Sequence, residues 1–431
     1  MKQNAYKFGF VILSLLCVVV STFGQILIKA EKTTEQEKSR SSSPQLRTIL
    51  YTFAQFTPFE KNGTRTPLSV SLEQIRVDTS VSPWRTISKK RLFQVNEEAG
   101  IHTFHPSPDY DQVIVAFQHA DFVLTFFQIN DLEWVSSDGK RKKRLTRDRG
   151  GYHDVIWSPD QKRIAYASRQ GMGRQLQSDS QVKWAVYSHD LKTGKRKKLY
   201  EERRENPADP SPVAFRYLLW LSPTQLLYTS TYPQGLFLLD IRGKPPILLT
   251  KNMPDAIFLK AHLALWYNYK AKQIRMATLP ADLSDLSLPQ TWNTIKLGKP
   301  YVFPGFPPEM SLSSDGQTLA VLVSTERNYE APRSLILLDV KTRKLRFVGS
   351  TDEPIYGLQW TKDGKSLTML LDPRSENPKD KLHKSIVGIL VPAGEGIPFE
   401  QFDWNQKMPL KYTELFAFPE GTEQVSWSDE K

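Results

Sequence analysis

The chain has 431 residues, of which 39% are hydrophobic and ten are tryptophan, so it is expected to fold around a large core rather than stay disordered. The only cysteine, Cys17, lies in an N-terminal apolar stretch, so the body of the protein can form neither a disulfide nor a cysteine-rich zinc site. The 29 prolines outnumber the 22 glycines, which favours many turns and short strands, and the net charge of +12 favours anionic partners.

The N-terminus carries the clearest signal for location. Residues 8–28 contain no charged side chain, and their length suits a helix that crosses a hydrocarbon core of ~30 Å. We interpret residues 1–30 as an uncleaved signal anchor, because the apolar run continues past Gly24. A signal peptide cleaved near Thr22 and Gly24 is the alternative. Long downstream domains translocate largely regardless of charge, so we expect a single-pass inner-membrane protein with a periplasmic body, or a secreted periplasmic protein after cleavage.

Two further segments precede the main pattern of the chain. Residues 31–44 are polar and have no apolar period, which predicts a flexible linker between the membrane and the folded body. Residues 45–100 form a β-rich segment with strand-like runs at 47–53 and 69–76.

From residue 101 to residue 397 the chain repeats one short motif. The clearest copy is WSPDQKRIAYA at 157–167, and the others are HPSPDYDQVIVAF at 105–117, WLSPTQLLYT at 220–229, LSSDGQTLAVLV at 312–323 and WTKDGKSLTMLL at 360–371. A degenerate sixth copy lies at 256–279. A period of roughly 40–65 residues that contains several short strands is typical of β-propeller blades.

Each repeat can be divided into four strands. In the second repeat the first strand ends at Trp157, a Ser-Pro-Asp corner follows, and strands are predicted at 163–168, 184–189 and 195–200. A ring of such units buries both faces of each small sheet and leaves few long edges. The predicted fold class is all-β: a six-bladed propeller over 101–397, preceded by an N-terminal transmembrane helix.

The C-terminal segment, residues 398–431, ends in QVSWSDEK, which echoes a first strand and its corner. Together with residues 45–100, this segment is a candidate for closing the ring through a shared blade. In that case the propeller has seven blades.

The pattern W-S-P-D-x-x-x-I-A-Y, followed by D-x-x-T-G-K, resembles the WD40-like PD40 repeat of TolB-type propellers and of prolyl-oligopeptidase-type propeller domains. This resemblance implies a six-bladed extracytoplasmic interaction platform. Residues 45–100 do not match the N-terminal domain of TolB, which puts membership of the Tol system in doubt. The sequence has no G-x-S-x-G nucleophile elbow, and residues 398–431 leave no room for a hydrolase domain, so peptidase activity is not expected.

Two histidines and two basic runs are the candidate site residues. His102 and His105 have the spacing of some metal-ligand pairs, but ordinary strand histidines are the favoured interpretation, and no metal, cofactor or catalytic residue is predicted. The basic runs fall at the same place in neighbouring repeats, the turn before the fourth strand and its start. They consist of Lys140, Arg141, Lys142, Lys143 and Arg144, and of Lys195, Arg196, Lys197 and Lys198.

Two functions are compatible with these features. The first is a non-enzymatic, membrane-anchored scaffold whose basic rim contacts another envelope protein, anionic lipid head groups or glycans. Protection of exposed sheet edges by lysine is the simpler explanation for the rim, and nucleic acid is not an expected partner. The second is a propeller enzyme or sensor that binds an anionic saccharide in the central funnel, with or without a metal.

Overall fold

The structure is a computed structural model, and it describes most of the chain beyond residue 45. The described residues are 46–56, 67–81, 83–96, 100–118, 130–148, 150–170, 183–203, 218–231, 234–251, 256–258, 263–268, 273–279, 293–296, 309–325, 331–372, 386–394, 396–402, 408–418 and 422–427. The predicted anchor (1–30) and linker (31–44) lie outside them. Within the ranges above, no helix is long and apolar enough to cross a membrane.

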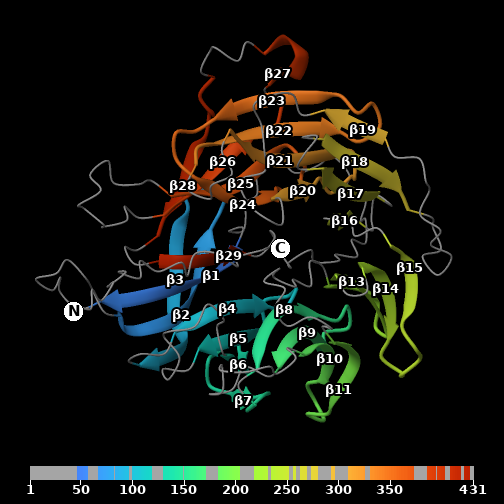
Figure 1. The fold of residues 1–431 in the computed structure, drawn as a ribbon. Helices are drawn as coiled ribbons and strands as arrows, with labels where there is room; N and C mark the ends of the chain where they lie inside the picture. The colour runs from blue at the N-terminus through green and yellow to red at the C-terminus, as the bar shows by residue number, and fades with distance from the viewer. Residues whose placement is uncertain are drawn as a thin grey trace, which may run out of the picture.

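Seven antiparallel sheets stand around a central axis (Figure 1). Blade 1 contains β4 (Ile101–Pro106), β5 (Gln112–Gln118), β6 (Asn130–Ser136) and β7 (Lys142–Arg144). Blade 2 contains β8 (Gly151–Trp157), β9 (Arg163–Gln170), β10 (Lys183–Asp190) and β11 (Arg196–Arg203). Blade 3 contains β12 (Leu218–Ser222), β13 (Gln225–Thr231), β14 (Gln234–Asp240) and β15 (Ile247–Thr250).

The next three blades keep the same order with two variations. Blade 4 contains β16 (Ala256–Phe258), β17 (Leu263–Asn268), β18 (Gln273–Thr278) and β19 (Asn293–Lys296). Blade 5 contains β20 (Met310–Leu312), β21 (Thr318–Ser324), β22 (Arg333–Asp339) and β23 (Leu345–Ser350), and β27 (Ile397–Pro398) adds a fifth strand to its outer edge before the short 3-10 helix η4 (Phe399–Gln401). Blade 6 contains β24 (Ile355–Trp360), β25 (Ser366–Leu371), β26 (Val387–Pro392) and β28 (Thr413–Ala417).

Blade 7 joins the two ends of the chain. It contains β29 (Thr422–Trp427), β1 (Leu46–Phe56), β2 (Pro67–Asp78) and β3 (Arg85–Asn96), in that order outward. The all-β propeller expected from the sequence is confirmed, with seven blades, one more than the six repeats counted. The degenerate repeat at 256–279 forms the first three strands of blade 4.

In four of the six repeats, a Ser-x-Asp or Thr-x-Asp pair builds the corner between the first two strands. In blade 2, Ser158 Oγ donates to Asp160 Oδ1 (2.6 Å) and accepts from the backbone N–H of Arg163 (3.0 Å). The same geometry recurs at Ser107 with Asp109, at Ser313 with Asp315 and at Thr361 with Asp363. Because all the partners lie within five residues, this turn forms from local sequence alone.

The tryptophan of the motif joins neighbouring blades. Trp157 Nε1 donates to the carbonyl of His105 in the innermost strand of the preceding blade (2.9 Å). Trp220 bonds the carbonyl of Ile156 (3.4 Å), and Trp360 bonds that of Ser311 (2.9 Å). Each acceptor is the last residue but one of its strand, so the three bonds set one fixed stagger between consecutive inner strands.

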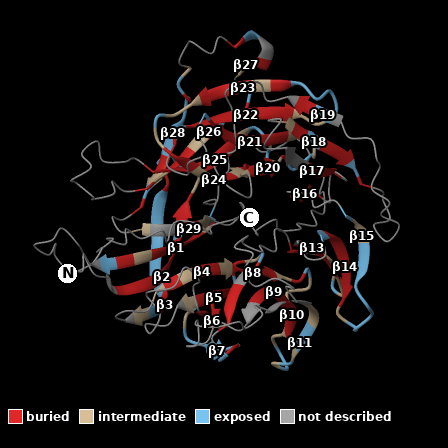
Figure 2. Ribbon diagram, viewed as in Figure 1, coloured by how far each residue is buried: buried red, intermediate tan, exposed pale blue. Residues whose placement is uncertain are grey.

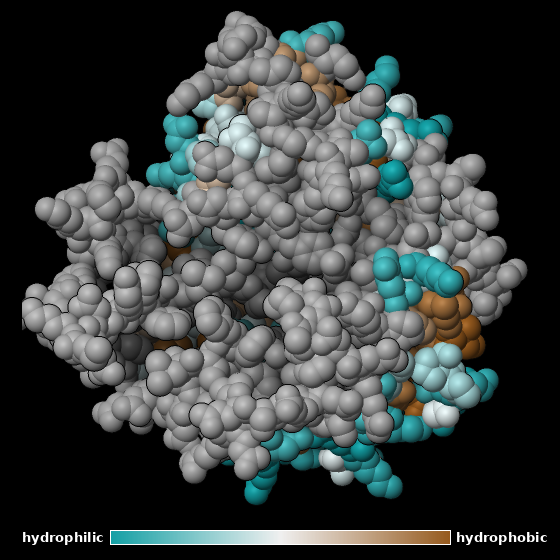
Figure 3. Space-filling model, in the orientation of Figure 1, coloured by the Kyte–Doolittle hydropathy of each residue, from teal (hydrophilic) through white to brown (hydrophobic). Residues whose placement is uncertain are grey.

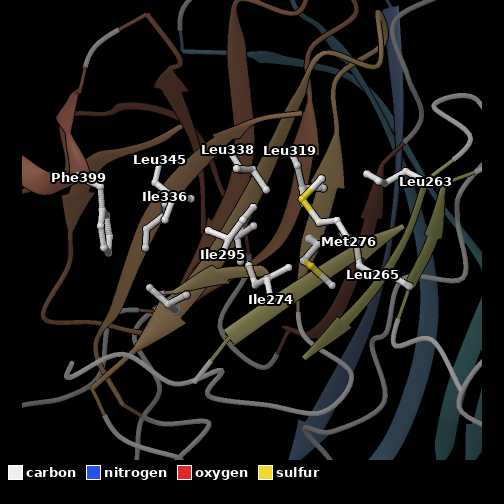
Figure 4. Close-up of a cluster of buried hydrophobic side chains, with 14 of the residues drawn as sticks. Leu263, Leu265, Ile274, Met276, Ile295, Leu319, Ile336, Leu338, Leu345 and Phe399 are labelled. Atoms are coloured by element: carbon white, nitrogen blue, oxygen red, sulfur yellow. The ribbon is translucent and has the colours of Figure 1, made fainter. Parts of the chain in front are cut away.

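The hydrophobic core consists of layers between blades, and Figure 2 shows that burial falls toward the outer strands. Between blades 4 and 5, Leu265, Ile274 and Met276 pack against side chains such as Leu319 and Ile336 (Figure 4). Two further clusters cover the two faces of blade 7 and tie it to blades 1 and 6. Each blade is therefore stabilised by its neighbours rather than by a core of its own.

Candidate functional site

The two basic runs lie on one continuous edge of the ring, here called the basic rim and defined by the nine lysines and arginines of 140–144 and 195–198. Lys143 Nζ donates to the carbonyl of Leu191, in the turn of blade 2 (3.0 Å). Lys197 Nζ repeats this contact one blade further on, with the carbonyl of Ile241 in blade 3 (2.7 Å). In each case the second residue of a fourth strand reaches the first residue after the third strand of the next blade. The lysines thus hold successive outer turns side by side.

Several rim side chains have partners within the protein. Arg144 pairs with the fully buried Asp131, and Arg141 lies over the ring of Trp134 at 5.7 Å. Lys142 lies 4.9 Å from the ring of Phe93 in blade 7, and Lys198 pairs with Glu201. Part of the rim therefore stabilises the ring, whereas Lys140 and Lys195 extend from exposed turns.

Arg196 has the most enclosed position of the nine. Its guanidinium lies 3.8 Å over the ring of Tyr187 and within 5.8 Å of the rings of Tyr152 and Tyr166. Its Nη1 pairs with Asp148 Oδ2 at 2.7 Å, and the hydroxyl of Tyr152 also donates to Asp148. Burial would raise the pKa of Asp148, but the hydrogen bonds from Tyr152 and Arg196, together with the positive charge of Arg196, outweigh burial and lower the pKa. Arg196 consequently anchors the connection from blade 1 to the tyrosines of blade 2 and is not a free contact group.

His189 is buried beside this tyrosine cluster, with 2% of its surface exposed and its ring 6.5 Å from that of Tyr166. Within the described part of the chain, neither ring nitrogen has a hydrogen-bond partner. Burial, together with the positive charges of Lys143 and Arg196, lowers the pKa of His189 to about 4. The protein therefore holds this imidazole in its neutral form.

This burial predicts a pH-dependent stability. The folded-state pKa lies below the ordinary value of 6.5, so the unfolded chain binds the proton more tightly, and stability falls as pH drops from 6.5 to about 4. We expect this decrease in the free energy of unfolding to be smaller in His189→Phe, by up to about 3 kcal/mol. Urea unfolding of both proteins at pH 7 and pH 4 measures the difference, and His105→Gln is the control. Parallel pH profiles for the parent and His189→Phe would contradict the prediction.

A second charged cluster joins blades 5 and 6, and the sequence reading did not identify it. Arg333 Nη1 donates to Glu309 Oε1 (2.8 Å) and to the carbonyl of Ile355 (2.6 Å), while the backbone N–H of Gly357 donates to Glu309 Oε2 (3.0 Å). The Arg333 side chain is 4% exposed and that of Glu309 is 19% exposed. Burial raises the pKa of Glu309 even though Arg333 opposes the shift, and burial also raises the pKa of Tyr356. Glu309 immediately precedes β20, and Tyr356 and Gly357 lie near the start of β24, so the cluster is located where the innermost strands of blades 5 and 6 begin.

The candidate metal ligands His102 and His105 both lie in β4, the innermost strand of blade 1. The side chain of His105 contacts the hydroxyl of Thr103 at 3.0 Å, and its carbonyl accepts the Trp157 bond. Among the residues that the structure describes, no three His, Cys, Asp or Glu side chains form a metal-binding group. His105 thus takes part in strand and blade contacts.

Comparison with protein-family models and with curated proteins gave no match. Solved structures do match, among them the periplasmic gluconolactonase of Pseudomonas aeruginosa, with a TM-score of 0.53 and 12% identity over 90% of this chain and 100% of that one. A proposed 6-phosphogluconolactonase from Bacteroides fragilis has a TM-score of 0.52 and 12% identity, covering 91% and 100%. TolB from Acinetobacter baumannii has a TM-score of 0.35 and 14% identity, covering 88% and 83%.

At such low identity, the similarities to the two lactonase structures support the fold alone and do not establish an activity. The two lactonase structures match about nine-tenths of the chain. The chain is therefore a seven-bladed β-propeller, with one blade more than the six that its PD40-type repeats predicted.

Proposed function

We propose that this protein is a non-enzymatic scaffold, anchored in the inner membrane by residues 1–30, whose propeller lies in the periplasm and binds another envelope protein. The observation that supports this proposal is the continuity of the basic rim, in which lysine bridges hold the outer turns of blades 1, 2 and 3 next to one another. A row of exposed cations on adjoining turns attracts an acidic protein surface and orients it before contact.

The rim can be tested by charge reversal at Lys140 and Lys195, which extend from exposed turns. We expect Lys140→Glu with Lys195→Glu to reduce capture of the partner by at least about fivefold. Each substitution replaces the attraction between an exposed lysine and an acidic side chain of the partner with a repulsion. The measurement is crosslinking in intact cells with a reagent that does not cross the inner membrane, followed by affinity purification.

The matched control reverses Lys341 and Lys344, exposed lysines in the corresponding turn of blade 5, which makes the same change in net charge. Equal capture by both variants would refute a role for the rim. Recovery of only small sugars or a metal, with no reproducible protein neighbour, would instead favour the saccharide-binding enzyme or sensor.

A further inference from the structure

The outer edge of blade 3 differs from those of its neighbours. Its last strand, β15, has the sequence ILLT, and Ile247 and Leu248 are 54% and 43% exposed. The outermost strands of blades 1 and 2 instead begin with lysine and arginine. Figure 2 shows β15 as an exposed strand, and Figure 3 shows hydrophobic surface at this edge of the molecule. An apolar strand edge in water invites pairing with another strand unless it is covered.

Among the described strands, β15 is the outermost of its sheet. It pairs with β14, with Ile247 opposite Leu238, Leu248 opposite Phe237 and Thr250 opposite Leu236. Pro245 and Pro246 stand immediately before it and Lys251 immediately after it, which limits any added strand to a short segment. Because adjacent strand residues point to opposite faces, the apolar pair would contact both faces of that segment.

Blade 5 shows that the outer edge of a blade in this protein accepts an added strand. There β27 pairs with β23 in antiparallel register, Ile397 opposite Phe347 and Pro398 opposite Arg346. Ile397 packs against the hydrophobic cluster of blades 4 and 5. The edge of blade 3 corresponds to this site, but among the strands that the structure places, none pairs with β15 from outside.

The charge around β15 defines the partner further. Lys244 and Lys251 are exposed at its two ends, and Arg242 is paired to Asp240. Lys197 of the basic rim reaches the turn that leads into β15, where it bonds the carbonyl of Ile241. The apolar edge is thus a continuation of the basic rim, and its complement is an apolar extended segment between acidic residues.

We infer that β15 binds, by strand addition, a short apolar β-segment of the partner protein that is flanked by Asp or Glu. This inference rests on the proposed scaffold function and names the contact that the scaffold uses. Main-chain hydrogen bonds would supply general affinity, and Ile247 and Leu248 would select apolar side chains.

The test uses the full-length protein in detergent micelles and a panel of fluorescent nonapeptides with apolar β-branched cores and Asp-Glu flanks. We expect binding, measured by anisotropy, to weaken at least about tenfold in Ile247→Lys with Leu248→Lys, and in peptides with a central proline. Ile87→Lys with Val81→Lys, at exposed apolar positions of blade 7, is the matched control and should bind normally.

Absence of binding by every peptide, or equal binding of the proline peptides, would overturn the inference. Self-association that is lost in the β15 variant would assign the edge to a second copy of this chain and would overturn it too. The scaffold proposal is tested separately, because the capture experiment in intact cells substitutes the rim lysines and leaves β15 unchanged.

Discussion

Deletion of residues 422–431 is expected to destabilise the propeller by more than the roughly 4 kcal/mol that marks an exceptional point substitution. The reason is that β29 supplies the innermost strand of blade 7, with five residue pairs to β1 that include Leu50 with Ser426 and Tyr51 with Val425. Ile49, Leu50 and Tyr51 are almost fully buried, and they would lose their cover when the ring opens. Urea unfolding followed by circular dichroism measures the change in the free energy of unfolding.

The control for this deletion is a chain shortened by residues 428–431 only, which keeps β29. The bare edge of β1 should also promote association, so size-exclusion chromatography should show oligomers of the longer deletion alone. If both shortened chains unfolded at the same urea concentration, ring closure by β29 would have no role in stability.

The sequence predicted blade 2 closely because its determinants are local. The expected strands at 163–168, 184–189 and 195–200 correspond to β9, β10 and β11. The side chains of Ser158 and Asp160 bond backbone groups within five residues, so the corner is encoded by a short motif. The recurring tryptophan bonds the preceding blade, and its spacing therefore reports the repeat itself.

The number of blades was harder to predict from the sequence because blade 7 depends on pairing between strands far apart in the chain. Residues 46–96 contain no Ser-Pro-Asp corner, and their innermost partner, β29, comes from the other end of the chain. The fourth strand of blade 6 is similarly hidden, since β28 pairs with β26 only after the chain has added β27 to blade 5. A motif search detects local turns and cannot detect such strand exchange.

The candidate functional residues also differ in whether local sequence or long-range packing brings them together. The basic runs are contiguous in the sequence, so their shared position on the rim could be inferred from their place in the repeat. Glu309, Arg333 and Gly357 are separated by 24 to 48 residues, and no motif joins them. Their meeting depends on how blade 5 is packed against blade 6, which the sequence alone does not state.

Replacing Arg333 and replacing Glu309 are expected to have unequal effects on stability, although the two residues pair with each other. Arg333→Met is expected to cost about 3 kcal/mol at pH 7, because it leaves a buried carboxylate without its cation and removes the bond to Ile355. Glu309→Gln should cost much less, since the raised pKa of Glu309 shows that the fold already disfavours its charge and an amide oxygen can still accept from Arg333. The double variant should accordingly be more stable than Arg333→Met alone.

The pH dependence separates this explanation from a simple loss of packing. A carboxyl whose folded-state pKa is raised contributes stability below its unfolded value, 4.5, and loses it as pH rises. Without Arg333 the pKa of Glu309 rises further. The loss in the free energy of unfolding that Arg333→Met causes should therefore shrink as pH falls from 7 to 4.5. The loss caused by the double variant should stay constant over the same range. Urea unfolding at both pH values is the measurement. A deficit of Arg333→Met that does not change with pH would mean that Arg333 acts through its contacts with the backbone and not through the charge of Glu309.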